Sequence, residues 1–399
     1  MLLLSLAVLL AMGLWFSASA VTPTLREVWD LSDGQVAWLS MAVTVGFVLG
    51  AFVSALTNVS DIYPPRIVFG LSAFVGAVAT ALITVSGGYG PALFLRFLTG
   101  IALAGVYPVG MKIMATWMKE DRGLGLGLFT GALIVGTASP HLIRAVGGIT
   151  YWQFVLLVAA GLAALGGVIA LLIGELGPYR GQPASFRWRY IGEVMRDRGL
   201  RLANFGYLGH MWELFSMVTW ISLFLLASFE AAEESNFLGM PAATAASLMA
   251  FFVIAASGPS SLLAGWLADR VGRTRVTIVA LAVSGTCALI IGFFFGLSPW
   301  LVSLVALIWG FAIAPDSGQF STAVSELSDP EYMGTALTLQ TSMGFLLTLI
   351  TVRLVPTLVD NIGWQWAFAF LALGPVFGIW AMARLKVSPD ARKLAGGRG

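Results

Sequence analysis

Six polar side chains lie within long apolar stretches of the sequence: Arg96, Lys112, His210, Glu213, Asp316 and Gln319. An ionisable group in such a stretch is costly and is by default a candidate for function. His210 and Glu213 are three residues apart, so they share one face of a helix. A carboxyl group desolvated there can load and release a proton. The alternative is a structural hydrogen bond between the two side chains or to a neighbouring helix.

Asp316 and Gln319 also share a helix face. Asp316 is expected to be a second proton or cation site, or the counter-ion of Lys112 or Arg96, because an unpaired buried charge is the costlier arrangement. Arg96 lies in the outer part of its stretch and can clamp an anionic substrate. Lys112 lies in the inner part of the same stretch, where its long side chain is expected to reach the aqueous interface.

Three further basic residues, His141, Arg144 and Arg353, lie near the outer ends of apolar stretches. Long basic side chains reach the headgroup level readily, so the simpler expectation is that these residues contact water at the interface. The alternative is an outer gate or a vestibule that attracts anions.

The composition excludes several classes of protein. Of the 399 residues, 58% are hydrophobic and 11% are charged, whereas soluble domains have about 45–50% apolar and about 25% charged residues. A net charge of +2 is too small to drive binding to nucleic acid. One cysteine and two histidines argue against a disulfide or a metal site. The sequence contains no Gly-x-x-x-x-Gly-Lys-Ser/Thr loop, which argues against an ATP-driven pump. We therefore expect no enzyme, no metal and no cofactor.

The elements that position these residues are twelve apolar runs, each long enough to cross a bilayer of roughly 30 Å as a helix. They cover residues 2–25, 35–56, 67–86, 92–117, 123–146, 153–174, 201–228, 242–264, 276–297, 300–326, 334–358 and 364–384. The first run lacks a positive n-region, so it is expected to be a retained span rather than a signal peptide. The expected class is an all-α membrane protein.

A long polar segment divides the twelve runs into two sets of six. It predicts an N-terminal bundle at 1–174, a linker at 175–198, a C-terminal bundle at 199–385 and a tail at 386–399. Three pairs of residues recur at nearly one offset: Asp61 and Asp269, Gly123 and Gly334, and Trp152 and Trp364. This recurrence indicates an internal duplication and two pseudo-symmetric bundles.

The distribution of lysine and arginine predicts the orientation. Basic residues concentrate at Arg66, in the turns at 119–122 and 270–275, in the linker and in the tail, all on one side of the membrane. Because cytoplasmic loops carry the excess of positive charge, both termini are expected to be cytoplasmic, in the inner membrane of a bacterium. The basic tail can also contact anionic lipid.

Two motifs carry a resemblance to a known family. The turn at residues 265–275 reads GWLADRVGRTR, and Arg96 opens the element RFLTG. Together with twelve spans in two halves and a basic linker, both motifs resemble those of the major facilitator superfamily. The resemblance implies a structural or proton-coupling role for Arg96 as the alternative to contact with a substrate. The loop of the first half that corresponds to 265–275 keeps Asp61 and Arg66 but loses the glycines.

The resemblance implies the positions of a cavity and a gate. The first, fourth, seventh and tenth helices of the family line a central cavity, and the six intramembrane residues lie in the fourth, seventh and tenth runs. The loop is implied to latch the cytoplasmic side when the transporter opens outward. The candidate gate residues are Asp61, Arg66, Gly265, Asp269, Arg270, Gly272 and Arg273.

The expected function is secondary active transport of a small solute by alternating access, coupled to protons through His210, Glu213 and Asp316. A monomer is expected to suffice, because one chain contains both halves. One alternative is a multidrug or metabolite exporter, a proton antiporter; the missing Gly-Pro element in the fifth run weakens it. A second alternative is a sensor or assembly factor with a transporter fold, against which the intact gate loop argues.

Overall fold

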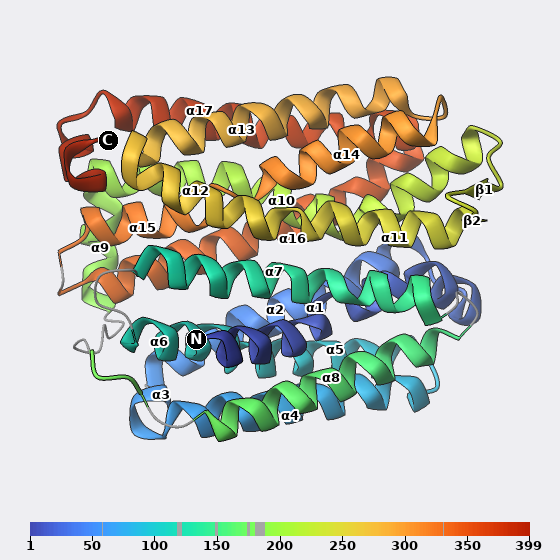
Figure 1. The fold of residues 1–399 in the computed structure, drawn as a ribbon, viewed down its shortest axis with the longest axis horizontal. Helices are drawn as coiled ribbons and strands as arrows, with labels where there is room; N and C mark the ends of the chain where they lie inside the picture. Colours follow the sequence, from blue (N-terminus) through green and yellow to red (C-terminus); the bar gives the residue numbers. More distant parts are fainter. Residues whose placement is uncertain (58, 118–121, 148–150, 174–175, 180–187, 330) are drawn as a thin grey trace.

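A computed structural model of the chain describes residues 1–57, 59–117, 122–147, 151–173, 176–179, 188–329 and 331–399. Nearly all of its elements are helices that run side by side along the long axis (Figure 1). Both chain termini lie toward one end, which we name the terminal end (Figure 1). A short β-hairpin lies at the opposite end, which we name the hairpin end (Figure 1).

The helices of the first half are α1 (Leu2–Trp29), α2 (Asp33–Thr57), α3 (Val59–Ile62), α4 (Pro65–Leu82), η1 (Ile83–Val85), α5 (Tyr89–Ala104), α6 (Tyr107–Thr116), α7 (Arg122–Gly147) and α8 (Trp152–Leu172). Those of the second half are η2 (Trp188–Tyr190), α9 (Ile191–Arg196), α10 (Arg198–Ala231), α11 (Ala242–Ala255), α12 (Ser257–Val271), α13 (Arg273–Ile290), η3 (Ile291–Phe294), α14 (Pro299–Ile313), α15 (Ser317–Leu327), α16 (Met333–Ala367), η4 (Ala369–Ala372), α17 (Leu373–Lys386) and η5 (Pro389–Gly397). The hairpin pairs β1 (Asn236–Phe237) with β2 (Met240–Pro241) in antiparallel register.

The helices match the apolar runs expected from the sequence. Among the described residues, eleven helical stretches are long and apolar enough to cross a membrane. The remaining expected run is α7, which is 26 residues long but contains His141 and Arg144 and is not among the eleven.

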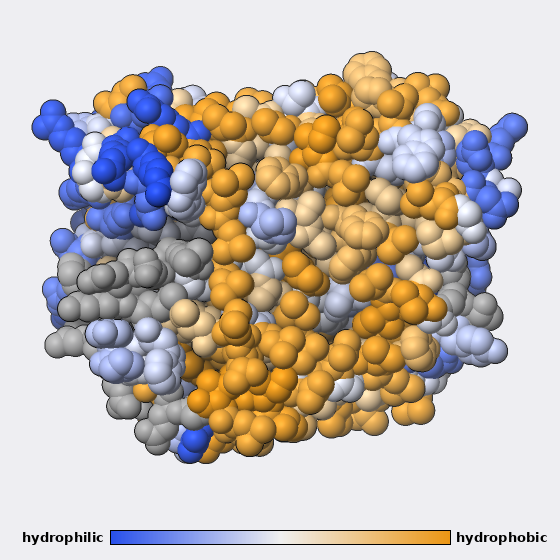
Figure 2. Space-filling view, viewed as in Figure 1, coloured by the Kyte–Doolittle hydropathy of each residue, from blue (hydrophilic) through white to orange (hydrophobic). Residues whose placement is uncertain are grey.

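Apolar and hydrophilic residues are distributed over the surface as expected of a membrane protein. On the face shown in Figure 2, a broad apolar band covers the middle and hydrophilic residues lie at the two ends. Large apolar side chains of α4, such as Leu71, Val75 and Val78, are more than half exposed. Exposed apolar area of this extent needs a lipid or protein partner, and on the face in view it lies between the two hydrophilic ends.

Three of the expected runs contain a local break in the helix, although each is still one stretch long and apolar enough to cross a membrane. The breaks fall between α5 and α6, between α11 and α12, and between α14 and α15. A proline lies at each break: Pro108, Pro259 and Pro315. Proline lacks an N–H donor and clashes with the preceding turn, so the helix cannot continue regularly through it.

The two halves meet along two seams. Within the first half, α1 packs on α7 and α8, and α2 packs on α5; within the second, α10 packs on α16 and α17. Between the halves, α7 contacts α11 and α12, and α2 contacts α16. We name these contacts the α7 seam and the α2 seam. The limits of the two bundles, the linker and the tail stay predictions, and residues 174–175 and 180–187 of that region lie outside the described part.

Candidate functional site

Arg96 on α5 is fully buried against α1 and α2. Its guanidinium donates hydrogen bonds to the carbonyl oxygens of Leu14 (2.9 Å), Trp15 and Leu39 (3.2 Å) and to the hydroxyl oxygen of Ser17 (3.2 Å). The backbone of α1 departs from helical geometry at Phe16, just after two of these carbonyl groups. Arg96 therefore has a set of neutral acceptors that holds a bend in α1.

His210 and Asp316 form a buried pair. The Nδ1 atom of His210 lies 2.9 Å from Oδ1 of Asp316, and each side chain is 1% exposed. Asp316 directly precedes α15, whose N-terminus carries a partial positive charge that favours an anion. The rings of Tyr207 and Phe320 pack against His210 at centroid distances of 6.1 and 5.9 Å. Asp316 is thus paired with a histidine of α10, rather than with Arg96 as one of the expectations had it.

Glu213 is 1% exposed and has partners of its own. The indole nitrogen of Trp309 on α14 donates to Oε1 (2.5 Å), and the hydroxyl of Ser284 on α13 donates to Oε2 (2.9 Å). His210 and Glu213 share one helix, as the spacing predicts, but each contacts different helices of the second half. Sequence reasoning missed Trp309 and Ser284, because neither is close to Glu213 in the chain.

Arg273, in the first turn of α13, is the centre of the loop at residues 265–275, the candidate gate that we name the gate loop. It donates to both carboxylate oxygens of Glu326 (2.6 and 2.7 Å), to the side-chain oxygen of Gln319 (2.9 Å) and to Asp269 (3.2 Å). Gln319 and Glu326 both lie on α15, which begins directly after Asp316. The structure therefore brings Gln319 to the gate loop, and one short helix joins this loop to the His210–Asp316 pair.

The C-terminal segment packs on the same loop. Gly272 has a φ of +100°, and a Cβ atom there would lie 2.5 Å from the carbonyl oxygens of Arg398 and Gly399. The Arg398 guanidinium donates to the carbonyl oxygen of Asp269 (2.7 Å). Glycine is therefore required at position 272 both for its backbone conformation and for the close approach of this segment.

The other predicted gate and cavity residues are more exposed or lie elsewhere. Arg270 is exposed, and its guanidinium stacks on the ring of Trp266 at 3.7 Å. Gly265 lies in α12, Arg66 in the first turn of α4 and Lys112 in α6, all partly buried. Asp61 belongs to α3, but its side chain lies outside the described part, as do residues 119–121 of the basic turn.

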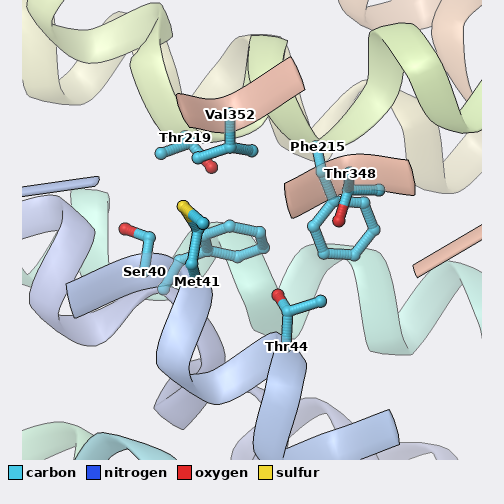
Figure 3. A pocket seen from close by; sticks show the side chains of 8 residues that line it. Ser40, Met41, Thr44, Phe215, Thr219, Thr348 and Val352 are labelled. Atoms are coloured by element: carbon cyan, nitrogen blue, oxygen red, sulfur yellow. The ribbon is translucent and has the colours of Figure 1, made fainter. Parts of the chain in front are cut away.

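A pocket lies between the halves at the α2 seam. Its volume is about 10 Å³, which is about the space that one water molecule needs. Its lining residues are Phe16, Ser40, Met41, Thr44, Phe215, Thr219, Thr348 and Val352, from α1, α2, α10 and α16 (Figure 3). The lining is uncharged, with four hydroxyl groups. None of the six intramembrane residues singled out from the sequence lines this pocket.

An aromatic layer closes the pocket on the side of the terminal end. Phe47 follows Thr44 by one turn on α2, and Phe345 precedes Thr348 by one turn on α16, so both lie nearer the terminal end. Their rings are 5.0 Å apart, and Trp15 contacts both at 4.8 and 5.6 Å. The layer joins the two halves across their interface.

The basic residues near the hairpin end differ in exposure. Arg353 on α16 is exposed and lies against Gly34 at the start of α2, where a Cβ atom would be 3.2 Å from its guanidinium. His141 and Arg144 on α7 are 0% and 2% exposed. Arg144 donates to the hydroxyl oxygen of Ser247 on α11 (3.1 Å), across the α7 seam. The expectation that these two residues contact water at the interface is therefore wrong, because the second half covers them.

Comparison with known proteins identifies the family. The family model described as Major Facilitator Superfamily matches residues 3–350 and 214–399. A protein of Thermus thermophilus named as a probable nitrate/nitrite antiporter is 26% identical over 292 residues, covering 68% of this chain and 61% of its own length, so less than two thirds of that relative is matched. The hexuronate transporter of Escherichia coli (strain K12) is 24% identical over 399 residues, covering 93% of this chain and 90% of its own.

Solved structures show the same fold. The crystal structure of a D-xylose-proton symporter has a TM-score of 0.74 and 16% sequence identity, and the match covers 98% of both chains. The predicted family, the all-α membrane fold and the absence of an enzymatic activity are thereby confirmed, because the relatives and neighbours are multi-pass membrane transporters. The family model matches nearly the whole chain, and this chain therefore belongs to the Major Facilitator Superfamily.

Proposed function

We propose that this transporter moves a small solute by alternating access, driven by a proton gradient, with its termini on the cytoplasmic side and as a monomer. The observation that carries the proton coupling is the pair of buried carboxyl groups in the second half, Glu213 and Asp316, one of which lies beside a histidine. Ionisable groups inside a membrane protein, held by specific partners, are characteristic of proton relays.

The solute is expected to cross at the interface of the halves. The pocket of Figure 3 draws its lining from both halves, as a site for alternating access requires. The aromatic layer of Trp15, Phe47 and Phe345 lies across this path and must separate when the halves rock. Hydroxyl groups beside apolar side chains suit a small polar solute.

The names of the relatives favour an anionic solute. Nitrate, nitrite and hexuronates all carry a negative charge at neutral pH, and transporters named for them match this chain over 68% and 93% of its length. Such a solute enters a negatively charged cell against the membrane potential, so co-transport of protons supplies the missing driving force.

The proton site is mechanically linked to the gate loop. The His210–Asp316 pair is held by the attraction between its two side chains, and a change in the protonation of either one changes that attraction. Asp316 precedes α15, and the same helix carries Gln319, a partner of Arg273. Protonation is thereby expected to shift α15 and loosen the gate loop.

The test separates coupling from transport. Wild type, Asp316→Asn and Glu213→Gln are reconstituted in liposomes and assayed with radiolabelled D-glucuronate and nitrate. We expect both variants to lose accumulation driven by a pH gradient but to retain counterflow, which needs no proton movement. Asp360→Asn, which changes an exposed carboxylate on α16, is the matched control and should accumulate solute like wild type.

Two outcomes contradict the proposal. Full gradient-driven accumulation in both variants would exclude these carboxyl groups as proton carriers. Absence of counterflow for every solute tested with wild type would instead favour a sensor or assembly factor.

A further inference from the structure

We infer that His141 and Arg144 form a binding site for the negatively charged group of the solute, a carboxylate or a small oxyanion, at the α7 seam. The inference rests on the proposed function and assigns it a site apart from the pocket of Figure 3. Both residues lie on α7, three positions apart, so their side chains are neighbours on one face of the helix.

The two side chains are buried and poorly satisfied. His141 is 0% exposed, and neither of its ring nitrogens has a hydrogen-bond partner among the described residues. Arg144 is 2% exposed; its Nη1 atom donates to Ser247, and its Nε atom has no partner among the described residues. Buried polar groups are nearly always hydrogen-bonded, so these unmet groups, side by side on one helix face, are suited to bind a polar ligand.

The two other arginines that are buried in the described part of the chain, Arg96 and Arg273, have a full set of hydrogen-bond partners. Arg96 donates four hydrogen bonds to neutral acceptors, and Arg273 donates four to two carboxylates and an amide. No ion pair involving Arg144 is found within the described ranges. A buried cation without a counter-ion is costly, and a bound anion removes that cost.

The donors present suit an anion. The guanidinium of Arg144 offers charge and directed N–H groups, which match carboxylate and oxyanion geometry. A neutral imidazole at His141 offers one N–H donor, and the Ser247 hydroxyl, which accepts from Arg144, can donate its own hydrogen to the same ligand. No acidic acceptor from the described residues competes at Arg144, so the site selects negative charge.

The location connects binding to the movement of the halves. Arg144 belongs to the first half and Ser247 to the second, so their hydrogen bond closes the α7 seam near the hairpin end. When the halves separate there, the hydrogen bond breaks and the side chains of His141 and Arg144 become accessible from that side. An anion that binds Arg144 and Ser247 together would then favour closure, because it contacts both halves.

The experiment measures anion binding to the purified full-length chain in detergent. The probes are sodium D-glucuronate, sodium nitrate and sodium benzoate, with D-glucose as the uncharged analogue of D-glucuronate, and binding is followed by ligand-dependent thermal stabilisation. We expect at least one anion, and not D-glucose, to stabilise wild type. Arg144→Gln is expected to weaken that binding at least about tenfold, and His141→Gln several-fold.

The control variants separate binding from structure. Arg353→Gln removes an exposed arginine at the same end and should bind the anion within about twofold of wild type. Ser247→Ala removes the closing hydrogen bond but leaves the guanidinium of Arg144 and the imidazole of His141, so it should lose less affinity than Arg144→Gln. If Arg144→Gln does not fold, Arg144→Lys and His141→Gln still report on charge and on the imidazole donor.

The results that overturn the inference differ from those that overturn the proposed function. Undiminished anion affinity in Arg144→Gln and His141→Gln, or no anion binding to wild type while a neutral solute shows counterflow, would refute the site. Equal losses in Ser247→Ala and Arg144→Gln would show that Arg144 only closes the seam. Anion binding that depends on Arg144 without any counterflow would sustain the site and refute transport.

Discussion

Replacing Arg96 with glutamine distinguishes a structural arginine from one that binds the solute. The side chain is fully buried and donates four hydrogen bonds to α1 and α2, three of them to backbone carbonyl oxygens. Glutamine is shorter and uncharged, so it cannot reach these acceptors together. We expect Arg96→Gln to destabilise the first half.

The size of the effect follows from the acceptors left behind. A buried carbonyl group without a donor costs about 1–3 kcal/mol. Loss of the buried guanidinium also removes its desolvation penalty, which offsets part of that cost. The Leu14 carbonyl oxygen keeps the Ser17 hydroxyl as a donor. For the other two carbonyl groups we expect a net loss of about 2–4 kcal/mol, which at roughly 2–4 °C per kcal/mol lowers the unfolding temperature by about 4–16 °C.

The assay is thermal unfolding of the purified protein in detergent, without solute. Arg353→Gln serves as the control, since an exposed arginine is expected to contribute within about 0.5 kcal/mol. An Arg96→Gln protein that melts like wild type but no longer binds D-glucuronate would refute the structural assignment and place Arg96 in contact with the solute.

Three further predictions concern packing and coupling. Gly100→Ala places a Cβ atom 2.0 Å from a backbone oxygen of α2, so thermal unfolding should show a loss of stability of roughly 1–3 kcal/mol. Gly90→Ala, which has open space around the new Cβ atom, is the control and should lose less than half as much stability. Trp309→Phe removes the donor to one oxygen of a buried carboxylate and should slow gradient-driven uptake several-fold while counterflow persists; unchanged uptake would contradict this. In a double-mutant cycle on transport rate, Asp316→Asn and Glu326→Gln should be non-additive by at least about 0.5 kcal/mol, because one helix carries both effects, and strict additivity would exclude the link.

The spans were predictable from the sequence, whereas their interruptions were not predicted. Apolar runs of sufficient length predict where helices cross, because a helix satisfies all of its backbone hydrogen bonds within its own segment in lipid. The prolines at 108, 259 and 315 were visible in the sequence, but prolines also occur within α1, α7 and α16, which continue past them. Whether a proline ends a helix depends on whether neighbouring helices offer hydrogen-bond partners to the backbone groups that the proline leaves unpaired.

The residue types at the candidate site were predictable from the sequence, but their hydrogen-bond partners were not. Spacing identified His210 and Glu213 as neighbours, since helical contacts follow sequence separation. The partners of Glu213 lie 71 and 96 residues away, and only tertiary packing brings them together. The same limit explains His141 and Arg144, whose burial depends on how closely the second half approaches α7.

In the second half, the helix α15 connects the His210–Asp316 pair to the gate loop. No such connection is found among the described side chains of the first half. Asp316 lies at one end of α15 and Glu326 near the other, about ten residues or 15 Å apart along a single helix. Because a helix of this length is stiff, a movement that separates Asp316 from His210 must also displace Glu326 from Arg273, or else distort α15. The break after α14 makes such a movement inexpensive, since α15 can turn there without bending a continuous helix. Protonation and gating are therefore expected to be coupled through the second half, while the first half supplies Arg96 as a fixed support and Arg144 for the solute.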